Sequence, residues 1–271
     1  MTNLIQKSAF ILFQRLIRLP SNPHWRNYDY NKQRNLKTQN GFLLCVSRLE
    51  QYNHIRTLKP YCCLLLYPLD YSFFDVRLDL EMKVDKKEMS PEQLRTIAFE
   101  TIKQRFPVEE WIHVYTDGCL TDRIQVAGAG VFSKLFSFYI PVGGYSTHFD
   151  GELKAIHVAL QQLSLRQSSF GRVVVLPDST SALQAISSYQ ECKNICVKQC
   201  QEVIKELSLK ISFQWVPSHC GIYGNVMADM LAKKGGTVLQ KPKTSASLPS
   251  IKLLTSPTCQ KTFRDFATRA L

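Results

Sequence analysis

The sequence lacks any apolar run of about 20 residues, the length that an α-helix needs to cross a bilayer, so we expect no membrane partner. Its nine cysteines include no Cys-x-x-Cys pair, which gives no sign of a zinc ribbon or a disulfide framework. There is also no Tyr-x-Asp-Asp motif, so the chain is not expected to polymerise nucleotides. The cysteine pattern favours a reducing compartment, so we expect an intracellular protein of the nucleus or the cytoplasm.

Acidic residues are scarce, and the scarcity is uneven. Lys and Arg outnumber Asp and Glu by 34 to 22, which gives a formal net charge of +12. Residues 1–110 have 17 basic and 12 acidic residues (+5), residues 111–236 have 11 and 9 (+2), and residues 237–271 have 6 and 1 (+5). Such a basic chain favours a polyanionic partner such as nucleic acid. If the central segment handles an anion, its acids need cations to offset them.

Composition also predicts how the chain is divided. The first 28 residues have four basic residues and no acid, and residues 4–19 can form a basic amphipathic helix. We interpret this helix as part of a truncated upstream domain, with a mitochondrial presequence as the alternative. Residues 20–60 are polar and rich in Asn, as loops and linkers are. We predict three parts: an N-terminal flank over 1–108, a folded domain over 109–236 and a basic C-terminal tail over 237–271.

Apolar periodicity and capping signals predict the elements of the folded domain. Its first three strands, at 111–116, 126–133 and 136–142, are close enough in sequence for an antiparallel meander. A capping box of Thr147 and Asp150 then begins a helix. The remaining elements are a buried strand before Asp178, helices from Ser179 and about Glu191, a strand over 210–217, and a helix from about Asn225. The order βββαβααβα predicts an α/β fold with a five-stranded mixed sheet and helices packed on it.

The flank has two elements of its own. Ser90, Pro91 and Gln93 form a capping box that predicts a helix ending before Pro107. Val76–Met82 alternates apolar and charged residues, which predicts a half-exposed strand.

The stretch Val114–Leu120 places the pair Asp117-Gly118 where the first strand should end. One interpretation is a turn, because Asp-Gly is a common turn dipeptide. An aspartic-protease loop is a second, but that family needs Asp-Thr-Gly or Asp-Ser-Gly. A metal ligand is the third, and it requires further carboxylates at the ends of other core elements.

Three further carboxylates are predicted at such positions. Glu152 is expected in the first turn of a helix, Asp178 at the end of the fourth strand, and Asp229 in the last helix. Each has a simple alternative role, as a helix-dipole partner, an N-cap or a surface acid. Together with Asp117 they offer the hard oxygen ligands that select Mg²⁺ or Mn²⁺.

Four segments, "YTDG", "GELKAI", "LPDS" and "WVPSHCGIYGNVMADMLAKKG", resemble the type I ribonuclease H family, particularly the form in arthropod non-LTR (Jockey-like) retrotransposon polyproteins. The resemblance implies a ribonuclease H-like fold in which Asp117, Glu152, Asp178 and Asp229 bind two Mg²⁺ ions, with Mn²⁺ as a substitute. It also implies that His219 assists proton transfer or product release and that Asn225 lies near the site. Gly118 and Cys119 are expected beside the RNA backbone.

The implied activity is hydrolysis of the RNA strand of RNA–DNA hybrids, a reaction that leaves 5′-phosphate and 3′-hydroxyl ends. We expect the protein to act as a monomer. The flank then resembles the region downstream of a retroelement reverse transcriptase. Four departures from the family's usual pattern occur: Cys119 for Ser, "LPDS" for Thr-Asp-Ser, Tyr223 for Pro and Val226 for Glu. One alternative is a domesticated module that binds hybrids with little or no cleavage. Another is a transposase or integrase, although those families end their acid set with Glu where this chain has Asp229.

Overall fold

The computed structural model describes residues 74–85, 88–121, 126–144, 146–169, 171–188 and 194–240, together with short pieces at 8, 10–13, 59–60 and 245–246. Residues 64–241 form one compact unit, and residues 1–63 and 242–271 form another. In the second unit, β1 (Lys59–Pro60) pairs in parallel with β8 (Ser245–Ala246). The predicted linker over 20–60, most of the predicted N-terminal helix and most of the basic tail lie outside the described residues. No helix in the described ranges has the length and apolar content to span a bilayer.

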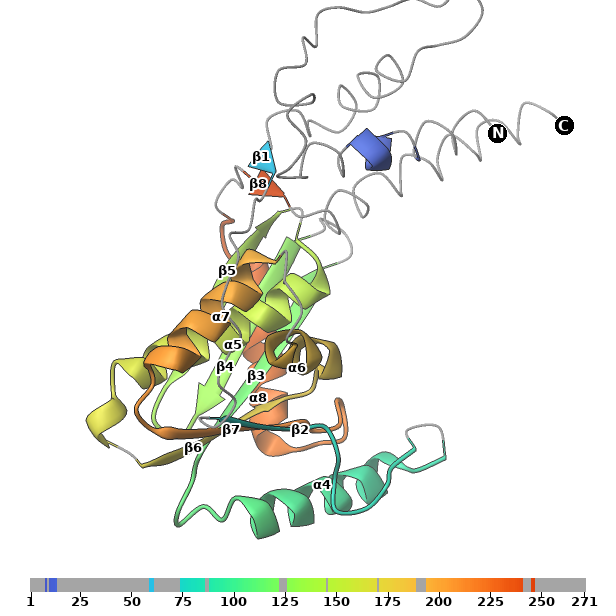
Figure 1. The fold of residues 1–271 in the computed structure, drawn as a ribbon. Coiled ribbons are helices and arrows are strands. Elements are labelled where there is room, and N and C mark those ends of the chain that lie inside the picture. Colours follow the sequence, from blue (N-terminus) through green and yellow to red (C-terminus); the bar gives the residue numbers. More distant parts are fainter. Residues whose placement is uncertain are drawn as a thin grey trace, which may run out of the picture. The chain divides into compact units, whose positions relative to one another are not determined.

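The unit of residues 64–241 is built on a six-stranded mixed sheet with the order β2-β7-β6-β3-β4-β5 (Figure 1). The three strands β3, β4 and β5 form the predicted antiparallel meander. β6, β7 and β2 extend the sheet in parallel from β3. The strands are β2 (Phe74–Arg77), β3 (Ile112–Thr121), β4 (Val126–Ser133), β5 (Ser137–Gly144), β6 (Arg172–Pro177) and β7 (Lys210–Gln214).

Five α-helices and a 3₁₀ turn connect the described strands: α4 (Pro91–Arg105), α5 (His148–Ser164), η3 (Gln167–Ser169), α6 (Thr180–Ser187), α7 (Ile195–Glu206) and α8 (Tyr223–Thr237). Both predicted capping boxes are present, because the Ser90 and Thr147 hydroxyls each accept a hydrogen bond from the backbone of the third helical residue. These caps satisfy N–H groups that have no partner inside the helix.

Helices α5 and α8 pack on opposite faces of the sheet. A side chain at Gly118 of β3 would collide with the backbone of Glu152 in α5. A side chain at Gly130 of β4 would collide with the backbone of Ala228 in α8. Gly118 pairs with Ala129, the residue before Gly130, and successive residues of a strand point to opposite faces. The glycines therefore let one helix approach closely from each side.

The prediction of a five-stranded sheet was incomplete, because β2 adds a sixth strand from the predicted flank. It pairs in parallel with β7, with Phe74 opposite Ile211. The alternating stretch Val76–Met82 overlaps this strand only over Val76 and Arg77. Pairing covers an edge of β7 that would otherwise present free N–H and C=O groups. The predicted functional division at residue 108 remains a prediction, while the compact unit begins at Leu64.

Candidate active site

The four predicted carboxylates lie together, lining one cavity of about 460 Å³. They come from four elements or their ends: Asp117, Glu152, Asp178 and Asp229. His219, Gly118 and Cys119 also line this cavity. Asn225 is buried beside it and donates a hydrogen bond from Nδ2 to Asp178 Oδ2 at 3.5 Å. The structure thus brings all eight residues selected from the sequence to one place.

Strand register places Asp117 beside Asp178. In the parallel pair of β3 and β6, Thr116 is opposite Pro177, and each aspartate is the next residue of its chain. Asp178 is not the N-cap of α6, because the Ser179 hydroxyl accepts from the Ala182 N–H and fills that role. The Asp178 carboxylate is therefore not used as the cap of α6 and lines the cavity.

The predictions that Asp117 ends its strand and begins a turn were wrong. β3 continues to Thr121, and Asp117 pairs with Gly130 of β4. The local dipeptide resembled a turn, but a long antiparallel partner strand kept the backbone extended. Asp117 instead marks the point where β3 separates from β6, which opens the sheet beside its side chain.

Gly118 brings Glu152 to this opening. An ideal Cβ on Gly118 would lie 2.3 Å from the Glu152 backbone nitrogen, so α5 can pack here only against glycine. This is a different reason for the glycine from the close nucleic-acid approach expected from the sequence. Glu152 begins the second turn of α5, one residue later than predicted, and its side chain is 1% exposed.

Helix α8 contributes Asp229 from the opposite face. It begins at Tyr223, two residues before the predicted start, and Asp229 Oδ2 accepts an ion-pair hydrogen bond from Lys233 Nζ at 2.6 Å. His219 lies in the loop before α8 with a φ of 56°, a left-handed conformation that His adopts more readily than most non-glycine residues.

Cys119 was predicted to lie beside the RNA backbone, but its thiol contacts helix α8. Its thiol donates to the Ala232 carbonyl oxygen of α8 at 2.9 Å. The residue is only 9% exposed, and burial raises the pKa of the thiol. Cys119 therefore holds α8 against β3, in addition to lining the cavity.

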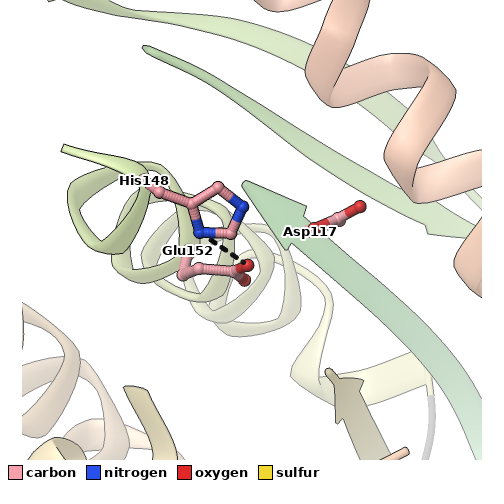
Figure 2. A group of neighbouring side chains, drawn as sticks. All are labelled: Asp117, His148 and Glu152. Atoms are coloured by element: carbon pink, nitrogen blue, oxygen red, sulfur yellow. Dashed lines mark ion pairs between the residues drawn. The ribbon is translucent and has the colours of Figure 1, made fainter. Parts of the chain in front are cut away.

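Two titratable residues of the cavity lining were missed by sequence reasoning. His148 faces Glu152 from one turn earlier on α5, and Lys233 faces Asp229 from one turn later on α8. Figure 2 shows the His148 ring directly above the Glu152 carboxylate, with the Asp117 side chain to the right of both. The signal was the i,i+4 spacing from a selected acid, which places two side chains on one helix face.

The carboxylates are placed where they repel one another. Burial, followed by the charges of Asp178 and Asp229, raises the pKa of Asp117 to about 8. Burial and the charges of Asp178 and Asp117 likewise raise the pKa of Glu152 well above its usual value. Neither carboxylate oxygen of Glu152 has a hydrogen-bond partner among the described residues. Buried charged groups normally have partners, so this oxygen-rich set fits divalent cations.

A comparison with protein families assigns the central segment. Residues 109–237 match the family model described as RNase H. These residues form an RNase H family domain. The chain is also 26% identical over 145 residues to Ribonuclease H1 of Homo sapiens. That match covers 46% of this chain and 50% of the human protein, so the chain spans half the length of this curated relative.

The acidic site is expected to destabilise the RNase H domain when cations are absent. An Asp carboxyl ionises near pH 3.8 when unfolded, whereas folded Asp117 keeps its proton up to about pH 8. The unfolded state therefore binds fewer protons between these pH values, so the free energy of unfolding falls as pH rises through this window. In EDTA at pH 8, Asp117→Asn should raise Tm by about 5 °C, and at pH 4 by much less.

Differential scanning calorimetry of both proteins at the two pH values measures this effect. Mg²⁺ should then raise the Tm of the wild type more than that of the variant, because binding stabilises only a competent site. A variant that is less stable than the wild type at pH 8 would contradict the proposed repulsion.

Proposed function

We propose that the chain cleaves the RNA strand of RNA–DNA hybrids internally, in a Mg²⁺-dependent reaction that leaves 5′-phosphate and 3′-hydroxyl ends. The observation that carries this proposal is the convergence of four carboxylates on one cavity within an RNase H family domain. Their oxygens suit hard divalent cations. Two bound Mg²⁺ ions, with Mn²⁺ as a substitute, would supply an activated water and charge stabilisation of the leaving 3′ oxygen.

The residues of the chain have distinct roles in this proposal. The two ions would be held by the carboxylate oxygens of Asp117, Glu152, Asp178 and Asp229. Asn225 orients the Asp178 carboxylate through its hydrogen bond. His219 is exposed and lines the cavity, and in this proposal it would carry a proton to or from the departing product.

Substrate contacts follow from what surrounds the carboxylates. Ser179, Thr180 and Ser181 line the cavity at the N-terminal end of α6, where hydroxyl and N–H groups can donate to phosphate oxygens. RNA would be selected by contacts to its 2′-hydroxyl groups in the wide minor groove. The two basic flanks, +5 each, would add salt-dependent affinity for the backbone. We further propose that the protein acts as a monomer and originates from a non-LTR retrotransposon polyprotein.

A cleavage assay with matched substrates tests the function. The protein is incubated with an RNA–DNA hybrid, a double-stranded RNA and a DNA duplex of one sequence, in Mg²⁺, Mn²⁺ or EDTA. We expect cleavage of the hybrid's RNA strand alone, in either metal and not in EDTA, with 3′ ends that a polymerase can extend. Cleavage of the hybrid in EDTA would contradict the proposed chemistry. Tight hybrid binding without cleavage would favour the binding-only alternative, which no structural observation favours at present.

A further inference from the structure

His148 is placed at the cavity in a way that the four-carboxylate set does not explain. It is the first residue of α5 and faces Glu152, with 3.6 Å between His148 Nδ1 and Glu152 Oε1 (Figure 2). One ligand atom each of Asp117, His148 and Glu152 lie within 4.8 Å of one another. A single cation can therefore contact an imidazole nitrogen and two carboxylates here.

The position of His148 is not that of a structural histidine. Its side chain is 59% exposed, so it fills no part of the core. Thr147 is the N-cap and Asp150 completes the capping box, so the helix start does not need the imidazole. The 3.6 Å separation from Glu152 is also too long for a hydrogen bond. Helix geometry brings the ring near the acid, since positions i and i+4 share a face, and the two side chains form an ion pair when the imidazole is protonated.

Glu152 gives independent support for a ligand at this point. Its side chain is 1% exposed, it lines the cavity, and both of its oxygens lack hydrogen-bond partners among the described residues. Among the described residues its ion-pair partner is His148, which compensates the charge only when protonated. A buried carboxylate that accepts no hydrogen bond is unfavourable unless a cation compensates it. Lys233 does not fill this role, because its ammonium group contacts Asp229 instead.

Donor chemistry then decides which cation the site favours. Carboxylate oxygens suit Mg²⁺ and Mn²⁺ alike, whereas imidazole nitrogen suits transition metals and is a poor ligand for Mg²⁺. We propose that His148 is a direct ligand that makes this site prefer Mn²⁺ over Mg²⁺. The proposal rests on the metal-dependent function above and adds to it a residue that sets metal preference.

Metal binding measured without turnover tests the proposal. The full chain is titrated with Mn²⁺ and with Mg²⁺ by calorimetry, and electron spin-echo spectra of the Mn²⁺ form are examined for coupling to imidazole ¹⁴N. In His148→Asn we expect the Mn²⁺ Kd to rise about 10-fold and the Mg²⁺ Kd to change by less than about 2-fold. The ¹⁴N coupling should be present in the wild type and absent in the variant. His148→Gln is a second variant with the same expectation.

Two further variants make the result specific. His219→Asn removes the other cavity histidine and should keep the ¹⁴N coupling. Glu152→Gln should weaken the binding of both metals. The proposal is overturned if His148→Asn retains the coupling and the wild-type Mn²⁺ Kd, which would make His148 a charge partner of Glu152 and not a ligand. Loss of the coupling in His148→Asn supports the proposal even if the wild type cleaves no hybrid, an outcome that would refute only the proposed function.

Discussion

Replacing Asp117 with Asn is expected to lower the rate of hybrid cleavage by at least about 10³-fold, equivalent to about 4 kcal/mol of transition-state stabilisation. The reason is geometric, because Asp117 sits where β3 separates from β6, among the acids of α5, α8 and the end of β6. An amide of the same size keeps the fold and removes the charge that binds cations. The measurement is single-turnover cleavage of a labelled hybrid in saturating Mg²⁺.

Asp75→Asn is the matched control for this change. Asp75 is an exposed acid of β2, pairs with Arg77 and does not line the cavity. It should keep wild-type cleavage. The expected stability effects differ as well, because Asp117→Asn should stabilise the metal-free protein while abolishing its activity. Substituting a residue that acts only in folding would lower stability and activity together. An Asp117→Asn protein that is both inactive and less stable than the wild type would therefore contradict the assigned role.

Removal of residues before 109 is expected to prevent folding, although the family match begins at that residue. The upstream segment supplies six buried apolar side chains to the same core: Phe74, Leu80, Leu94, Ala98, Ile102 and Phe106. At about 1.5–3 kcal/mol for each large side chain, their loss amounts to roughly 10 kcal/mol, comparable to the entire stability of a typical domain.

Polar contacts strengthen this expectation. Gln214 of β7 is fully buried and is satisfied by Arg105 and by the Asp79 carbonyl oxygen, at 3.0 and 2.9 Å. Without the upstream segment this amide would lose these two partners and keep only the Trp215 carbonyl oxygen. The edge of β7 would also lose its parallel strand.

Circular dichroism and thermal melts of two fragments provide the measurement. The fragment 64–241 should fold with a cooperative transition, whereas 109–241 should show little or none. If 109–241 melts within about 5 °C of the longer fragment, β2 and α4 are an accessory to the fold and not part of it.

The acidic cavity illustrates a conflict between stability and the proposed function. Burial, followed by repulsion from Asp178 and Asp229, raises the pKa of Asp117 to about 8, which destabilises the metal-free fold at neutral pH. The surrounding packing offsets this destabilisation, because α5 and α8 pack closely on β3 and β4 where Gly118 and Gly130 make room for them. Natural proteins commonly retain such unfavourable groups where activity requires them.

Local signals predicted most elements because their causes lie within a few residues. The capping boxes at Ser90 and Thr147 involve side chains three residues apart, and the buried β6 is apolar throughout. Helix starts were less certain, since α7 begins at Ile195 after the cap Asn194, later than the expected Glu191.

Pairing between distant segments explains what local signals misjudged. Asp117-Gly118 has the sequence of a turn, yet eight residues of β3 pair with β4 and keep this segment extended. The alternating stretch Val76–Met82 was offset from β2, which spans Phe74–Arg77. Pairing with β7 fixes where this short strand begins and ends.

The sequence by itself determined the α/β class and the strand meander, because periodicity and capping signals are properties of the chain. Its resemblance to a known family selected the eight residues that meet at the cavity. Only the tertiary structure decided that β2 and α4 belong to the fold and that Gly118 makes room for α5. Those facts depend on register and on close backbone approach between segments far apart in sequence. Such contacts are set by the packing of the whole sheet, so no local pattern encodes them.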